Sequence, residues 1–340
     1  MKLESAQPIR FGSHLQALPL VTLYLTERCN SRCVTCDYWR HGRLDVNLDF
    51  VRRLLPSLAA LQTRTVLISG GEPLLNAEWL PIAQLLQQQG LGLWLLTSGL
   101  SLAKHARDAV SVFETITVSL DGTSAATYAA IRGVDAFEHV CRGIRAATSR
   151  GATVSVRVTL QRANYRELPA FVELARQLGV RQISFLAVDV ANPHAFGRTD
   201  AFGTDIALRP EDLPVLEQLL SQLEQTHAQE FRSGFIAESP RKLRNILAYF
   251  AAVCGLGEAP PVRCNAPEFS AVVNAQGRVS PCFFIPGPTD PLVGGDLAAA
   301  LNSDAMVALR ATIRAGGRAE CSSCVCSLWR EPASFGHQHA

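Results

Sequence analysis

Three cysteines stand close together near the start of the sequence: Cys29, Cys33 and Cys36, with the spacing C-x3-C-x2-C. A zinc site needs a fourth cysteine or histidine, and zinc motifs usually come as two separated pairs of ligands. An iron–sulfur cluster can instead be held by three thiolates, with one of its four irons left open. The spacing therefore favours a cluster with one open iron.

Four more cysteines lie near the other end of the chain, in the pattern C-x12-G-x4-C followed by C-x2-C: Cys264, Cys282, Cys321 and Cys324. Two runs of β-forming residues flank residues 274–277, and Gly277 suits a turn position with positive φ, which predicts a hairpin over 268–284. Such a hairpin and a tight final pair can bring four thiolates to one centre. An all-cysteine zinc site and a closed [4Fe–4S] cluster both fit this pattern.

The remaining cysteines belong to neither pattern. Cys141 has helical spacing with apolar neighbours, which predicts a place in the core. Cys254 ends an apolar helix, where core packing and a place in a cavity wall are both open. Cys326 follows Cys324 by two positions and is interpreted as a structural cysteine, an alternative ligand to Cys324 or a hydrogen-atom donor. Cys254 and Cys326 are the candidate catalytic thiols.

Alternating strands and helices must position these groups. The pattern predicts strands at 20–25, 65–69, 91–97, 115–120, 153–160 and 182–188, with helices at 48–61, 77–90, 102–110, 135–149 and 165–179 between them. Pro56 is expected to kink or divide the first helix. Such alternation requires a parallel sheet covered by helices, either open or barrel-like. Further helices are predicted near 211–227, 240–254 and 296–314.

The composition limits the remaining classes of function. The 340 residues are 48% hydrophobic, which suffices for a large core. The net charge of +2 comes from scattered charges, so we expect neither nucleic acid nor an anionic membrane surface as a partner. Because no long apolar run and no apolar signal core is present, we expect a cytoplasmic protein whose thiols stay reduced.

The C-x3-C-x2-C loop after the first strand resembles the signature of the radical S-adenosylmethionine (SAM) superfamily. The segment ISGGEP at 68–73, after the second strand, resembles the Gly-Gly-Glu-Pro motif of that family. The resemblance implies a [4Fe–4S] cluster whose open iron is chelated by SAM. It also implies a 5′-deoxyadenosyl radical that abstracts a substrate hydrogen, and an electron donor such as flavodoxin or ferredoxin.

The resemblance assigns six residues to SAM, four in the glycine-rich motif and two on later strands: Gly70, Gly71, Glu72, Pro73, Ser119 and Arg157. Glycine lets the backbone approach a ligand closely, and Glu72 would accept from the SAM amino group. Arg157 lies inside an apolar strand and would pair with the SAM carboxylate, because a buried arginine needs an anion. An outward position on the barrel surface is the alternative for Arg157.

One position departs from the family pattern. The residue before the third cysteine is usually bulky and packs near the SAM adenine, whereas here it is Thr35. Tyr38 and Trp39 follow closely and are candidates to compensate. Four charged residues on loops at the expected open face are predicted to be solvated in preference to binding substrate: Asp121, Asp189, His194 and Arg198.

The C-terminal cysteine pattern resembles the Twitch domain, a shortened SPASM extension of radical SAM enzymes that binds one auxiliary [4Fe–4S] cluster. The implied α/β fold is a partial (β/α)6 TIM-like barrel, followed by a small α+β auxiliary iron–sulfur domain with a β-hairpin. We assign residues 18–190 to the barrel, 191–260 to a helical linker region and 261–330 to the Twitch domain. Molybdenum-cofactor cyclases of the superfamily place three cysteines near a C-terminal Gly-Gly, so the pattern here argues against that activity.

Together the two cysteine groups predict a radical SAM oxidoreductase (dehydrogenase) or epimerase. Its substrate would be small and hydroxylated (a sugar, aminocyclitol or aminoglycoside) and would belong to natural-product biosynthesis. The alternatives are crosslinking or epimerisation of a ribosomally made peptide and, in another class, a zinc-stabilised binding protein without catalysis. The short segment before the first strand leaves no room for a peptide-recognition domain, which favours the small substrate.

Overall fold

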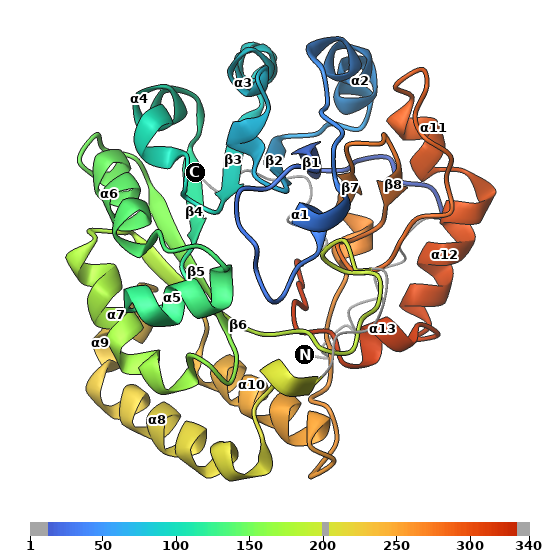
Figure 1. Ribbon diagram of the computed structural model, residues 1–340. Helices are drawn as coiled ribbons and strands as arrows, with labels where there is room; N and C mark the ends of the chain where they lie inside the picture. Colours follow the sequence, from blue (N-terminus) through green and yellow to red (C-terminus); the bar gives the residue numbers. More distant parts are fainter. Residues whose placement is uncertain (1–12, 199–203, 332–340) are drawn as a thin grey trace, which may run out of the picture.

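The computed structural model describes residues 13–198 and 204–331, and one eight-stranded sheet organises them (Figure 1). The strand order is β6-β5-β4-β3-β2-β1-β7-β8, and every neighbouring pair is parallel except β7 with β8. The strands are β1 Leu20–Thr26, β2 Thr65–Gly70, β3 Gly92–Thr97, β4 Thr115–Ser119, β5 Val154–Leu160, β6 Gln182–Ala187, β7 Ser270–Val273 and β8 Val279–Ser280. The sheet is not closed, so the expected partial barrel is confirmed.

Helices follow each of the first five strands and ring the outside of the sheet (Figure 1). They are α2 Leu48–Ala60, α3 Trp79–Gln88, α4 Leu102–Val112, α6 Phe137–Thr148 and α7 Leu168–Gln177. Each covers the sheet with an apolar stripe, as a parallel sheet requires on its helix-covered face. Pro56 does not divide α2, which continues through it, so the predicted division is wrong.

A short helix that the sequence did not indicate, α5 Ala125–Arg132, lies between β4 and α6. Ser124 caps its N-terminus by accepting a hydrogen bond from the Thr127 backbone. It ends at Gly133, whose φ of +68° is the left-handed conformation that glycine adopts readily. The sequence did not indicate α5 because its eight residues give only two helical turns of apolar pattern, beside the longer pattern of α6.

The helices after the barrel strands are α8 Leu213–Thr226, α9 Ala228–Arg232, α10 Pro240–Val253, α11 Leu297–Leu301, α12 Asp304–Arg314 and α13 Ala319–Ser322. The single helix predicted near 296–314 is two helices, because Ser303 caps the start of α12 and ends the run. The linker region predicted at 191–260 includes residues 199–203, which lie outside the described residues. None of the described helices has both the length and the apolar character needed to cross a membrane.

The predicted hairpin is present, and it extends the barrel sheet. β7 and β8 pair antiparallel across the turn at Gly277, whose φ is +76°. β7 also pairs in parallel with β1, from Leu20 opposite Ser270 to Leu23 opposite Val273. Cys264 and Cys282 of the second group therefore flank a hairpin that continues the sheet from β1, the strand that precedes the first group.

Alternation along β5 decides which side chains face the inside of the sheet. Val154, Val156 and Val158 are buried, while the residues between them are only half-buried. Successive side chains of a strand point to opposite faces, so the valines pack in the core beneath the helices. Arg157 and Thr159 consequently face the concave side, where the first cysteine loop lies.

Candidate functional site

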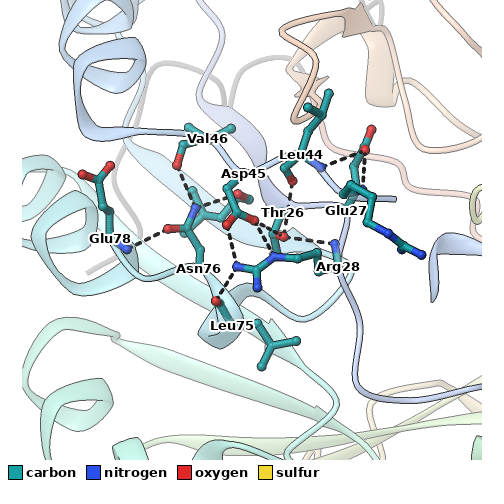
Figure 2. A network of polar contacts seen from close by, with 11 residues as sticks. Thr26, Glu27, Arg28, Leu44, Asp45, Val46, Leu75, Asn76 and Glu78 are labelled. Atoms are coloured by element: carbon teal, nitrogen blue, oxygen red, sulfur yellow. Dashed lines mark hydrogen bonds and ion pairs between the residues drawn. The ribbon is translucent and has the colours of Figure 1, made fainter. Parts of the chain in front are cut away.

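The three cysteines of the first group lie on the loop that follows β1, and all three line one cavity on the concave side of the sheet. A polar network holds the root of this loop (Figure 2). The Thr26 hydroxyl donates to Asp45 Oδ1 at 2.5 Å, and the Arg28 backbone N–H donates to that hydroxyl at 3.0 Å. The Arg28 guanidinium donates to Asp45 and to the Leu75 carbonyl.

Buried Asn76 completes the network from the other side (Figure 2). Its side-chain amide donates to the Leu25 carbonyl at 2.8 Å and to the Val46 carbonyl at 2.7 Å. Its oxygen accepts from the Glu78 backbone N–H at 2.7 Å. The network fixes the end of β1 against the turn after β2. The sequence did not indicate the residues of this network, because each of them pairs with a residue distant in sequence.

The glycine pair of the Gly-Gly-Glu-Pro motif lets this turn press against the cysteine loop. The Gly71 backbone N–H donates to the Thr26 carbonyl and that of Glu72 to the Arg28 carbonyl, both at 2.8 Å. A Cβ on Gly71 would lie 2.2 Å from the Arg28 carbonyl oxygen, and one on Gly70 would lie 2.4 Å from that of Thr26. Gly70 and Gly71 both line the cavity.

Glu72 is fully buried, and its carboxylate is already hydrogen-bonded. One oxygen accepts from the Thr97 hydroxyl at 2.7 Å and from the Leu74 backbone at 3.3 Å. The other accepts from the Ser98 backbone at 2.7 Å and from its hydroxyl at 2.5 Å. A carboxylate has about four acceptor positions, so binding the SAM amino group would require one of these bonds to be exchanged.

Pro73 begins a short 3-10 turn, Pro73–Leu75, and is buried. Within the described part of the chain, neither Pro73 nor Glu72 lines the cavity. Both residues shape the turn that carries Gly70 and Gly71. Thr97, the last residue of β3, and Ser98 hold Glu72 and line the cavity themselves.

Ser119 and Arg157 lie opposite each other on β4 and β5, and both line the cavity. The inward position of Arg157 excludes the outward alternative. Its Nε is buried and has no hydrogen-bond partner among the described residues. A buried donor without a partner is costly, so this side chain suits an anionic ligand in the cavity.

Aromatic side chains form much of the remaining wall: Tyr24, Tyr38, Phe196, Phe283 and Phe284. Tyr38 packs edge-on against Tyr24, with ring centroids 5.9 Å apart. Phe196 packs against Phe284 in the same way at 5.7 Å. Thr35 also lines the cavity, so Tyr38 and Phe196 supply aromatic surface beside the position where the family has a bulky residue.

The prediction that the four charged loop residues are solvated is wrong for three of them. Asp121, Asp189 and Arg198 are buried, and only His194 is exposed. Arg198 donates to the Asp189 carbonyl at 2.6 Å and to the Asn192 carbonyl at 3.0 Å, so it holds the loop after β6 together. Internal hydrogen bonds, which the sequence does not reveal, make this burial possible.

The four cysteines of the second group line another cavity, beside the hairpin: Cys264, Cys282, Cys321 and Cys324. Cys326 lines this cavity and the first one, and so do Phe283 and Phe284. The two cavities therefore share a wall. Cys141 is buried in the core as predicted. Cys254 donates from its thiol to the Leu208 carbonyl at 3.3 Å and does not line the first cavity. Of the two candidate catalytic thiols, Cys326 is therefore the one that faces the first cavity.

The surroundings of both groups suit metal-bound thiolates. Burial raises the pKa of Cys29 to about 11 and that of Cys282 to about 12. Such thiols need nearby positive charge to ionise, and a bound metal centre supplies it. Across residues 13–198 and 204–331, no three Cys, His, Asp or Glu side chains are grouped closely enough for a single metal ion.

Comparison with known proteins places this geometry in a family. Residues 23–175 match the radical SAM superfamily. This match, which spans less than half of the chain, assigns residues 23–175 to that superfamily. The matched residues contain the cysteine loop and the glycine-rich turn described above.

Similarity to individual proteins extends further along the chain. A probable GTP 3′,8-cyclase of Saccharolobus islandicus is 29% identical over 283 residues, which is 81% of this chain and 85% of the cyclase. A pre-heme d1 synthase of Dinoroseobacter shibae is 30% identical over 173 residues, 48% of this chain and 41% of that protein. The structure of SuiB from Streptococcus suis bound to the precursor peptide SuiA superimposes with a TM-score of 0.67, at 15% identity, over 92% of this chain and 71% of SuiB.

Proposed function

We propose that this radical SAM enzyme oxidises or epimerises an alcohol carbon of a small hydroxylated substrate, such as a sugar, aminocyclitol or aminoglycoside, in natural-product biosynthesis. The observation that carries this proposal is the wall shared by the two cavities. Phe283, Phe284 and Cys326 each face both of them. A substrate in the first cavity would lie between the first cysteine group and the second.

Residues of both groups would hold the cofactors. Cys29, Cys33 and Cys36 would bind the SAM-associated [4Fe–4S] cluster, and the second group would bind an auxiliary [4Fe–4S] cluster in a Twitch-like region. When bound, the first cluster with SAM supplies a radical that removes a substrate hydrogen, and the auxiliary cluster supplies an electron acceptor. We include an external electron donor such as flavodoxin or ferredoxin, and a cytoplasmic location, in the proposal.

The chain's own residues would orient the ligands and exclude water. Arg157 would use its unpaired Nε and its charge to hold the SAM carboxylate, with Ser119 beside it. Gly70 and Gly71 would form the floor on which SAM lies. The aromatic wall would exclude water from the cavity, which would protect a radical from side reactions. Cys326, in the wall of the cavity, would return a hydrogen atom to a substrate radical.

Incubation with SAM, reductant and candidate sugars in deuterated water, without oxygen, tests the reaction. A ketone without deuterium uptake indicates dehydrogenation, and deuterium at an inverted carbon indicates epimerisation with a thiol donor. Cys326→Ala should abolish epimerisation but leave an oxidation intact, while Cys141→Ala serves as the matched core-cysteine control. If SAM cleavage persisted after replacement of Cys29, Cys33 or Cys36, the proposal would be wrong.

Iron analysis separates the auxiliary cluster from a structural zinc ion. Two [4Fe–4S] clusters require roughly eight irons per chain, and Cys282→Ser should lower the count to roughly four. A wild-type protein that contains zinc and only roughly four irons per chain would contradict the auxiliary cluster. Zinc alone at both sites would support the non-catalytic alternative.

A nucleotide cyclase is the second candidate function. The similarity to a probable GTP 3′,8-cyclase covers 85% of that protein, which favours this candidate. The four-cysteine pattern of the second group argues against it. Modification of a ribosomal peptide is favoured only by the shared fold with SuiB. Parallel incubations with GTP and with precursor peptides, each followed by mass spectrometry, distinguish these candidates from a sugar-modifying enzyme.

A further inference from the structure

We propose that Arg132 donates hydrogen bonds to the cluster held by Cys29, Cys33 and Cys36 and raises its reduction potential, with Asp121 as the residue that positions it. This inference rests on the proposed cluster at the first cysteine group. It assigns a role to a buried ion pair beside that cavity, Arg132 with Asp121, for which the SAM and substrate assignments give no function.

The end of α5 is fixed directly against the cysteine loop. The Arg132 carbonyl accepts from the Arg32 backbone N–H at 2.9 Å, and the Ile131 carbonyl accepts from that of Val34 at 3.0 Å. These two bonds lie on either side of Cys33. Gly133 follows with positive φ, and a Cβ there would lie 2.3 Å from the Arg32 carbonyl oxygen. Arg132 therefore has a defined position relative to the thiols.

The Arg132 side chain is buried and lines the same cavity as the three thiols. One terminal nitrogen donates to Asp121 Oδ2 at 3.0 Å. Its Nε is also buried, and it has no hydrogen-bond partner within the described residues. A buried N–H without an acceptor is destabilising, and a ligand that accepts from it removes that cost. Thiolate and sulfide sulfurs of a cluster are the acceptors that this position favours.

Charge supports the same assignment. The Arg132 guanidinium carries a positive charge and lines the same cavity as Cys29, Cys33 and Cys36. A guanidinium that stabilises a thiolate also stabilises the extra electron of a reduced cluster. Reduction potentials of iron–sulfur clusters depend on nearby net charge and on hydrogen bonds to the sulfurs.

Asp121 holds the arginine and moderates its charge. Its Oδ1 accepts from the Thr159 backbone N–H at 2.7 Å, while its carbonyl accepts from the Asn164 side chain at 3.0 Å. These bonds fix the carboxylate, which in turn fixes the guanidinium. Asp121 follows β4 by two residues, and it is not among the described residues that line the cavity. It acts on the cluster through Arg132.

The test is an anaerobic redox titration of the full-length protein, followed by electron paramagnetic resonance of the SAM-sensitive cluster signal. Arg132→Gln should shift the midpoint potential to a more negative value, because a positive charge is lost. Asp121→Asn should shift it in the opposite direction, because the charge of Arg132 is no longer balanced. Arg52→Gln, an exposed arginine on α2, is the control and should cause no shift.

A wild-type midpoint in a cluster-containing Arg132→Gln protein would overturn the proposal and leave Arg132 a structural residue. If this variant loses its cluster, Asp121→Asn decides the matter: an upward shift supports the proposal and an unchanged or lower midpoint refutes it. A wild-type protein without a SAM-sensitive cluster signal would instead contradict the proposed function. The two failures are therefore distinguishable.

Discussion

Gly71→Ala should separate the glycine-rich turn from the cysteine loop. The added Cβ would lie 2.2 Å from the Arg28 carbonyl oxygen, whereas the closest comfortable carbon–oxygen contact is roughly 3.3 Å. The contact is with backbone, so rotation of a side chain cannot relieve it, and the two segments must move apart by about 1 Å. That movement breaks the hydrogen bonds from Gly71 to Thr26 and from Glu72 to Arg28.

Each lost bond contributes about 1 kcal/mol, and a buried group left unpaired adds to the loss. We therefore expect the free energy of unfolding to fall by about 2–4 kcal/mol. Urea denaturation of the anaerobic protein measures this change, and production of 5′-deoxyadenosine measures the accompanying loss of SAM cleavage. Gly257→Ala is the matched control, because no atom lies within 4 Å of its added Cβ and its backbone is exposed. Equal unfolding midpoints for both variants would refute the reasoning.

Two further predictions concern the supports of the cavity. Ser98→Ala removes a hydroxyl that donates to the buried Glu72 carboxylate at 2.5 Å. The free energy of unfolding should therefore fall by about 1.5–3 kcal/mol. An unchanged urea midpoint would show that this hydrogen bond is dispensable. Arg198→Met removes a fully buried cation and leaves Asp189 without it, so we expect a loss of about 3–5 kcal/mol and faster proteolysis within 189–198. Wild-type resistance to protease would contradict the role of Arg198 in that loop.

Features that depend on neighbours along the chain were predictable from the sequence. The six strands alternate with helices because apolar residues recur with strand or helix spacing, and the hairpin follows from the turn at Gly277. Three cysteines within one loop must lie close together in any fold. Pro56 does not divide α2 as the sequence allowed, because the helix continues through this residue.

The tertiary structure decided how distant residues meet. Arg157 lies on the concave face, and the carboxylate of Glu72 accepts hydrogen bonds from Thr97 and Ser98. β7 pairs with β1 across about 250 residues of sequence. The tertiary structure also brought Cys326 into the wall between the two cavities. The sequence alone determined which chemical groups are present and which short segments carry them. Only packing determined their partners, because burial, hydrogen bonding and charge pairing depend on contacts that local sequence patterns do not contain.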